Sequence, residues 1–200
     1  MPKEYVMPKA VYVIGGSGTG KSTFVEEALG AEAEFSPQYQ VALGYDSAQR
    51  KAPLVGHRVR TSRGEVTYLG VHRDQYPGLD GVSRLAYLGF NAWAVAGLDK
   101  AVIAEGRVLL NKRTLSLFNT AADLLVVHLV PAPEVQAAWL EARGYAPEPA
   151  KVREATTRAA NMARYVEEEE GGDVLRLDTA DSDERTAAIL AVRSHLWEGQ

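Results

Sequence analysis

The residues whose types and spacing point most clearly to chemistry are Gly15-Gly16-Ser17-Gly18-Thr19-Gly20-Lys21-Ser22. The spacing G-x-x-x-x-G-K-[ST] is typical of a loop that holds phosphate groups. Glycines allow a tight backbone whose N–H groups face phosphate oxygens, and the lysine adds a positive charge. Apolar residues 11–14 predict a strand before the motif, and residues 22–29 predict a helix after it. The motif therefore predicts a phosphate-binding loop for a nucleoside triphosphate.

We expect nucleotide contacts from the whole loop and the first helical turn, namely Gly15, Ser17, Gly18, Thr19, Gly20, Lys21, Ser22 and Thr23. Lys21 should reach the β- and γ-phosphates and acts as a catalytic residue, while the Ser22 hydroxyl should ligate Mg²⁺. We take the nucleotide to be ATP, although the sequence leaves GTP open as the preferred nucleotide. The stretch Asn111-Lys112-Arg113-Thr114 lacks the acid of a guanine-reading motif.

A carboxylate is expected beside this loop, at the end of another strand. Residues 102–106, Val-Ile-Ala-Glu-Gly, resemble the second acidic element of small-molecule and nucleotide kinases. That resemblance implies that Glu105 holds magnesium through water or accepts the proton of an attacking hydroxyl. Asp80 is the second candidate for the base. For either acid, capping of a loop or helix is the alternative.

Arginines on two successive helices resemble the lid that nucleotide kinases close over the phosphates. Arg143 ends one predicted helix, a Gly/Pro interruption follows, and the next helix carries further arginines. Arginine binds phosphate oxygens bidentately, which suits phosphoryl transfer. We assign Arg143 and Arg158 to catalysis, in a lid covering about residues 141–165; a solvated helix face is the alternative for each.

The acceptor is expected to bind in the long segment of about residues 44–100. Between residues 50 and 84 there are seven Lys/Arg and three acids, so positive charge is concentrated there. Residues 54–61 and 66–71 flank a turn containing Gly64 and predict a β-hairpin. We expect acceptor contacts from Asp46, Arg58, Arg60, Arg73 and Asp74. An ordinary exposed hairpin with mixed charges is the alternative.

Residues 69–83, Leu-Gly-Val-His-Arg-Asp-Gln-Tyr-Pro-Gly-Leu-Asp-Gly-Val-Ser, resemble a signature of phage-type P-loop kinases. Family members have Thr at the position of Leu79. Together with the phosphate loop, Glu105-Gly106 and Arg143-Gly144, the resemblance spans roughly residues 11–165. Some such kinases phosphorylate 5-hydroxymethyluracil within DNA. The resemblance thus implies an ATP- and Mg²⁺-dependent kinase with a nucleotide-like acceptor, and DNA is one candidate.

These elements must be positioned by an α/β fold in which strands and helices alternate. We expect one domain, residues 1–200: a P-loop NTPase three-layer fold with a five-stranded, mainly parallel sheet, a hairpin-containing acceptor-binding insertion and a helical lid. Predicted core strands are residues 11–14, 41–45, 101–104, 124–130 and 173–177. Predicted helices are residues 22–29, 82–97, 111–122, 133–143, 151–168 and 184–197.

Composition favours a soluble, cytoplasmic protein, in the host cytoplasm if it is phage-encoded. The 200 residues include no cysteine, which excludes disulfides and thiolate metal sites, and no apolar run approaches a membrane span. The net charge of -4 does not favour nucleic acid as a partner, whereas the excess of positive charge in residues 50–84 does favour it. A free nucleoside or nucleotide kinase and an ATP-hydrolysing switch without an acceptor remain alternatives. A degenerate kinase is disfavoured by the intact Lys21-Ser22 pair.

Overall fold

In the computed structural model, residues 7–45, 51–72, 78–84, 86–96, 98, 100–144 and 147–197 are described, together with the side chains of all of these except residues 43–45 and 51–52. Described strands are β1 (Lys9–Gly15), β2 (Glu34–Phe35), β3 (Tyr39–Tyr45), β4 (Lys51–Thr61), β5 (Gly64–Leu69), β6 (Val102–Glu105), β7 (Asp123–Leu129) and β8 (Asp173–Leu177). Described helices are α1 (Lys21–Leu29), α2 (Ala86–Ala96), α3 (Lys112–Ala121), α4 (Pro133–Ala142), α5 (Pro149–Glu168) and α6 (Ser182–Trp197), with a 3₁₀ turn η1 (Leu79–Gly81).

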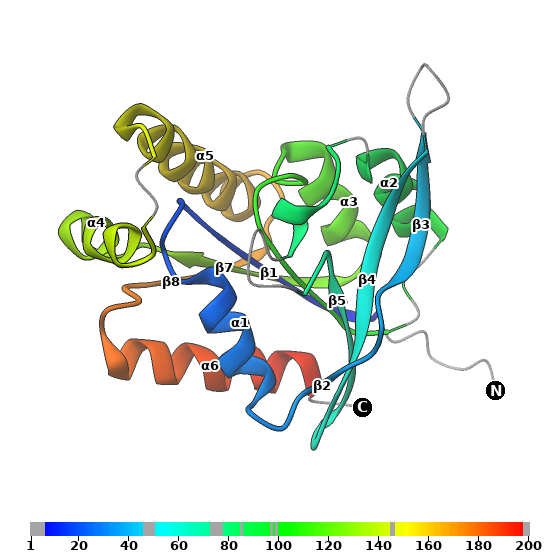
Figure 1. Ribbon diagram of the computed structural model, residues 1–200. Helices are drawn as coiled ribbons and strands as arrows, with labels where there is room; N and C mark the ends of the chain where they lie inside the picture. The colour runs from blue at the N-terminus through cyan, green and yellow to red at the C-terminus, as the bar shows by residue number, and fades with distance from the viewer. Residues whose placement is uncertain are drawn as a thin grey trace.

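One sheet organises the molecule (Figure 1). Its order is β2-β4-β5-β6-β1-β7-β8, with β3 paired to β4. Pairing is parallel from β5 to β8 and antiparallel among β2, β3, β4 and β5. The α/β class is confirmed. The predicted five-stranded, mainly parallel sheet is wrong in size and type, because the sheet has eight strands and is mixed.

The difference arises in the segment between α1 and β6. Residues 41–45 were expected to form a core strand, but β3 is an antiparallel strand that pairs with β4. The predicted hairpin exists as β4 and β5, and β5 pairs in parallel with β6. Strands β4 and β5, within the expected insertion, therefore belong to the main sheet itself. The apolar side chains of β5 are buried on both faces of this sheet.

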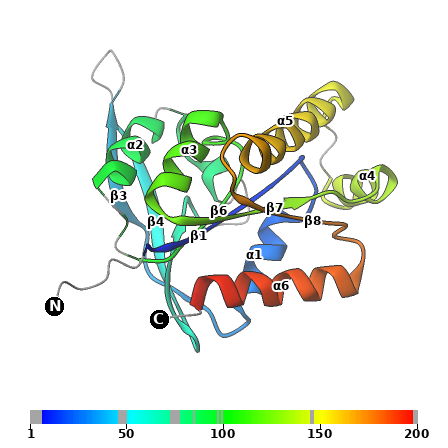
Figure 2. The same cartoon turned by 180° about the vertical axis from the view of Figure 1, so that it is seen from behind.

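Helices cover both faces of the sheet. Helices α1 and α6 pack on one face, where Phe24 and Val192 are buried together. Helices α2, α3 and α5 pack on the other face around Tyr12, Phe90 and Phe118. Turning the molecule shows α6 lying along the sheet below α1, and α4 beside α5 (Figure 2). This layering brings the loops after β1 and β6 to the same edge of the sheet.

The two loops leave that edge toward opposite faces. The chain continues from β1 into α1 on one face, and from β6 it leads to α3 on the other. β1 and β6 are neighbours, with Val13 paired to Glu105. In open α/β sheets, a crevice where connections diverge at the carboxyl ends of strands is the usual place for a ligand.

Candidate functional site

The loop from β1 to α1 has the backbone that the motif predicts. Gly18 and Gly20 have φ angles of 76° and 82°, in the left-handed region where glycine is favoured. Helix α1 has no side-chain cap at Gly20 and no acidic residue in its first turn. Its N-terminal N–H groups and the positive end of its dipole therefore suit an anion.

Lys21 lies folded against this loop. Its Nζ donates to the carbonyl oxygens of Gly16 (2.8 Å) and Gly15 (3.4 Å). Burial lowers the pKa of the Lys21 ammonium, while the nearby carboxylates Asp80 and Glu105 raise it. The ammonium is thus held at the loop among opposing charges, within reach of any anion that the loop binds.

Three residues from two elements distant in sequence brace the loop. Gln136 on α4 donates through Nε2 to the Ser17 carbonyl oxygen (2.6 Å). Thr179, after β8, donates through Oγ1 to the Thr19 carbonyl oxygen (3.2 Å). Leu140 on α4 lies so close to Gly18 that a Cβ there would be 2.6 Å from Leu140 Cγ. The loop shape is therefore fixed by α4 and by the segment after β8 as well as by its own glycines.

Glu105 ends β6 beside the loop and is 2% exposed. Ser22 Oγ donates to Glu105 Oε2 (2.9 Å), and the Tyr68 hydroxyl donates to Glu105 Oε1 (2.9 Å). Burial raises the pKa of the Glu105 carboxyl, whereas Lys21 and the two hydroxyl donors lower it. A buried carboxylate thus lies between the predicted magnesium ligand Ser22 and a tyrosine on β5.

Asp80 reaches the same edge through a set of close glycine contacts. Its Oδ1 accepts a hydrogen bond from the Arg107 backbone N–H (2.8 Å). A Cβ on Gly106, whose φ is 107°, would be 2.9 Å from Asp80 N, and a Cβ on Gly78 would be 2.4 Å from Glu105 Cγ. Turn η1 therefore packs directly on the end of β6, and Asp80, whose negative charge acts on Lys21, also caps the loop after β6.

Arg143 is placed near the loop, at one side of a hollow of about 320 Å³. The hollow is lined by Gly18, Gly20, Thr23, Trp139, Ala142, Arg143, Thr179 and Arg185. Besides burial, the positive charges of Arg107 and Arg143 lower the pKa of Lys21. Arg185 is fixed by hydrogen bonds from Nε (2.7 Å) and Nη2 (2.6 Å) to Glu27.

Other predicted site residues lie elsewhere. Arg158 is exposed on α5 and pairs with Glu154 of its own helix at 3.2 Å, as the alternative reading expects. Arg60 lies toward the opposite end of the sheet, where it pairs in register with Glu65, and Arg58 lies between the two ends, in register with Thr67. Glu65 is four residues before Leu69, the neighbour of Ala104, which places Arg60 about 13 Å from that edge at strand spacing. These arginines do not join the site.

Three further predicted residues, Asp46, Arg73 and Asp74, lie outside the described residues. The other expected nucleotide contacts, Gly15, Ser17, Gly18, Thr19, Gly20, Ser22 and Thr23, all belong to the loop and the first turn of α1.

Several residues of this region were not assigned from the sequence: Tyr68 as a partner of Glu105, Gln136 as a partner of the loop, Arg107 as a partner of Asp80, and Trp139 and Arg185 as lining of the hollow. Arg107 directly follows Glu105-Gly106 and could have been found from that position. The others reach the site through strand register and helix packing, for which no local pattern exists.

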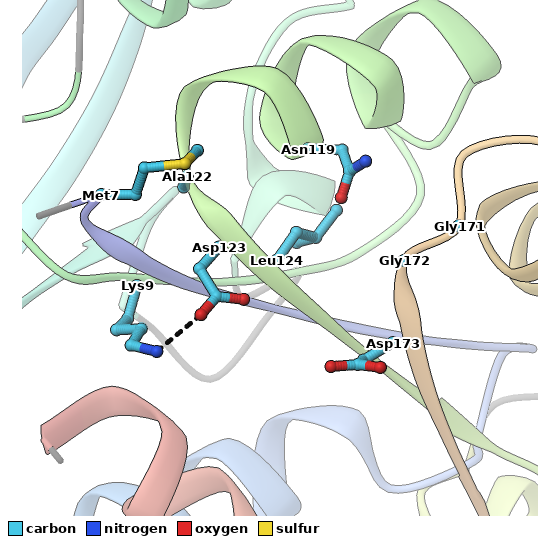
Figure 3. A pocket seen from close by; sticks show the side chains of 9 residues that line it. All are labelled: Met7, Lys9, Asn119, Ala122, Asp123, Leu124, Gly171, Gly172 and Asp173. Atoms are coloured by element: carbon cyan, nitrogen blue, oxygen red, sulfur yellow. Dashed lines mark hydrogen bonds and ion pairs between the residues drawn. The ribbon is translucent and has the colours of Figure 1, made fainter.

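Two further hollows lie outside this centre. One, of about 880 Å³, lies between α4 and α5 and is lined mainly by apolar residues, with Gln136 and Thr156 among its polar ones. The other, of about 380 Å³, lies at the amino end of β1, β7 and β8, around the Lys9–Asp123 ion pair (Figure 3). Neither hollow is lined by Glu105 or Lys21.

Within the described ranges, no group of three or more His, Asp or Glu side chains is arranged to hold a metal ion. No described helix is both long and apolar enough to cross a bilayer.

Comparison with known proteins gives little. No protein-family model matches the chain, and no curated protein matches it. Among solved structures, the chain is similar to the cytosolic domain of the T. maritima FeoB iron transporter in its apo form, with a TM-score of 0.34 and 9% identity. The match covers 95% of this chain, which spans 66% of that chain, just under two thirds. A likeness at this level assigns no activity to this chain.

Proposed function

We propose that this chain is an ATP-dependent kinase that transfers the γ-phosphate to a hydroxyl of a nucleotide-like acceptor. The observation that carries the proposal is the 2.9 Å hydrogen bond from Ser22 Oγ to Glu105 Oε2, which joins the phosphate loop to a buried carboxylate on the neighbouring strand. Phosphoryl transfer requires positive charge around the phosphates and a carboxylate that holds the metal or accepts the proton. Groups of both kinds lie at this edge of the sheet.

The nucleotide is proposed to lie across the loop. Its phosphates would accept hydrogen bonds from the uncapped N-terminus of α1, with Lys21 leaving the Gly15 and Gly16 carbonyl oxygens to contact them. The hollow beside Gly18 and Gly20 would take the base, with Trp139 available for stacking. Arg143 and Arg107 would neutralise charge on the transferring phosphoryl group.

Magnesium fits the donor set because Ser22 and Glu105 present oxygen ligands, and Mg²⁺ usually takes one or two protein oxygens together with substrate phosphates. When bound, Mg²⁺ would offset the negative charge of the β- and γ-phosphates. Glu105 would orient Ser22 by accepting a hydrogen bond from its hydroxyl, and Tyr68 would fix the other carboxylate oxygen.

In the transfer step, the acceptor hydroxyl oxygen forms a bond to the γ-phosphorus as the bond from that phosphorus to the β–γ bridging oxygen breaks. The hydroxyl proton goes to a carboxylate, and ADP leaves. Both oxygens of Glu105 already accept hydrogen bonds, from Ser22 and from Tyr68. This favours Glu105 as the carboxylate that binds magnesium rather than the one that accepts the acceptor's proton. Asp80, less buried and near Lys21, is then our proposed base.

For the acceptor, the hydroxymethyl group of 5-hydroxymethyluracil in DNA is our first candidate, on the resemblance of residues 69–83 to phage-type kinases. Because chemistry on a base within a duplex requires its extrusion, this reaction would need a flipped base. A free nucleoside or nucleotide is the second candidate. It gains weight from the position of Arg60, which lies about 13 Å along the strand from this edge and so does not supply a backbone contact there.

The experiment is to incubate the protein with Mg²⁺ and γ-labelled ATP in the presence of hydroxymethylated DNA, plain DNA or free nucleosides and nucleotides. Label on an acceptor supports the kinase, and the labelled species identifies its class. Release of labelled phosphate with no labelled acceptor would instead support a hydrolysing switch, and failure to bind ATP would overturn the whole proposal.

A further inference from the structure

Four rings gather on the α1 face of the sheet, next to Glu105 and outside the phosphate loop. They are Phe35 at the end of β2, His57 on β4, Tyr68 on β5 and His72 just after β5. The Phe35 and His72 rings are stacked, with centroids 3.7 Å apart and planes 4° apart. His57 and Tyr68 meet the Phe35 ring edge-on, at 6.1 Å and 5.7 Å.

Hydrogen bonds hold this stack in place. His57 Nδ1 lies 2.8 Å from the Ser36 carbonyl oxygen, and the His72 backbone N–H donates to His57 Nε2 (3.2 Å). Nε2 must be the acceptor, so His57 is the neutral tautomer whose Nδ1–H donates to Ser36. The His57 side chain therefore links Ser36, which follows Phe35, to the backbone of His72.

The stack is not a buried core feature. His72 is exposed and Phe35 is only partly buried, whereas Tyr68 beneath them is 2% exposed. Because the His72 imidazole is left in solvent, this ring pair buries less apolar surface than an aliphatic side chain packed over Phe35 would. Its orientation is nevertheless fixed by three strands, which is the property of a preorganised binding surface.

Tyr68 links the stack to the proposed transfer centre. Its ring centroid is 6.4 Å from that of His72, and its hydroxyl donates to Glu105 Oε1 at 2.9 Å. A molecule lying on His72 would therefore reach the carboxylate edge within the length of a nucleoside. Planar rings suit such a surface because base–aromatic stacking is favourable for every nucleobase.

We propose that the Phe35–His72 pair is the stacking platform for the planar base of the acceptor. This inference rests on the proposed kinase function, and it adds that the acceptor is recognised through an aromatic ring seated on the β2–β5 side of Glu105. The hollow at Trp139 and Arg143 is separate, and it is left to the ATP base.

The test uses fluorescent bases whose emission is quenched on stacking: single-stranded trinucleotides, and the matching free nucleosides, carrying 2-aminopurine or pyrrolocytosine. The nucleotide site is filled with a non-hydrolysable ATP analogue and Mg²⁺, whose binding is measured separately. We expect saturable quenching of at least one probe by the wild-type protein. His72→Ala should weaken probe binding by roughly 10-fold, since stacking on an aromatic contributes about 1–3 kcal/mol per base.

Two variants keep the result interpretable. His72→Phe preserves a stackable ring and should retain the quenching. His195→Ala, which alters a histidine whose Nε2 lies 3.0 Å from the Asp123 carbonyl oxygen at the other end of the sheet, should bind the probes as the wild type does. Thermal unfolding of each variant identifies any general loss of structure.

The platform is overturned if no probe is quenched by the wild-type protein, or if His72→Ala quenches and binds like the wild type. Because quenching needs no phosphoryl transfer, a chain that stacks the probes but labels no acceptor keeps the platform and loses the kinase. A chain that labels an acceptor with no loss in His72→Ala keeps the kinase and loses the platform.

Discussion

The two ends of the sheet use charge in different ways. At the carboxyl end, Glu105 and Lys21 lie among hydrogen bonds from several elements, and burial shifts the pKa of each away from its ordinary value. At the amino end, Lys100 pairs with Glu65 and Lys9 with Asp123 at the surface. Exposed pairs contribute little, typically under about 1 kcal/mol, whereas buried groups with shifted pKa values tend to gather at functional sites.

The largest effect should follow from removing the charge at the carboxyl end. Lys21→Ala deletes the ammonium that we expect on the transferring phosphate, so transfer or hydrolysis should fall by roughly 10³-fold or more. Turnover of labelled ATP measures it. Lys100→Ala, at the amino end, is the matched control and should turn over like the wild type; unchanged turnover in Lys21→Ala would remove the basis of the proposed function.

Removal of the buried carboxylate is the next test of the contrast. Glu105→Gln keeps the size of the side chain but loses the negative charge that faces Ser22 and would hold the metal, and kcat should fall by roughly 10²- to 10³-fold. Glu65→Gln makes the same change in a surface pair and should leave kcat within about twofold. Equal effects of the two substitutions would show that the ends of the sheet do not differ in function.

Close packing around Glu105 should also show in the stability of backbone variants. Gly70 has a φ of 107°, and a Cβ there would be 2.0 Å from the Gly78 carbonyl carbon, so Gly70→Ala should lower the free energy of unfolding by about 3 kcal/mol or more. Gly144 has a φ of 64° with no described atom within 4 Å of its Cβ position. Gly144→Ala should therefore cost about 1 kcal/mol. Urea unfolding measures both, and a similar loss in the two variants would contradict the close packing around Glu105.

The buried carboxyl also predicts a pH dependence. Because the pKa of Glu105 is raised in the folded state, the folded protein binds this proton more tightly than the unfolded chain does. Its contribution to the free energy of unfolding therefore falls as the pH rises from the ordinary value of 4.5 through the raised pKa. Between about pH 5 and pH 8, Glu105→Gln should gain stability relative to the wild type, in paired urea unfolding curves. A constant difference between the two proteins would mean that the Glu105 pKa is not raised.

What the sequence could predict was local. Residues 15–22 sit between a strand and a helix, and Glu105 ends an apolar run, so both could be placed at the loop edge without tertiary information. Tyr68 meets Glu105 only because β5 pairs in parallel with β6, and the His72–Phe35 stack needs β2, β4 and β5 together. Contacts of this kind depend on strand partners far apart in the chain, and no spacing pattern in the sequence encodes them.

The assignment of Arg58 and Arg60 to acceptor binding stays a prediction, and these two residues give the smallest expected effect. Alternation places two such residues on one face of a strand, but it does not say toward which end of the sheet they lie. Arg58 packs over the Tyr39 ring at 5.7 Å, and both arginines lower the pKa of Glu65, which is held chiefly by Lys100. Arg58→Gln and Arg60→Gln should each leave KM for the acceptor within about twofold, the range of a surface substitution. Steady-state kinetics at low salt measure this, where any contact with a phosphate backbone is strongest. A larger rise in KM, lost at high salt, would mean that the acceptor extends along β4 from Glu105 to the amino end of the sheet, as only a polymer could.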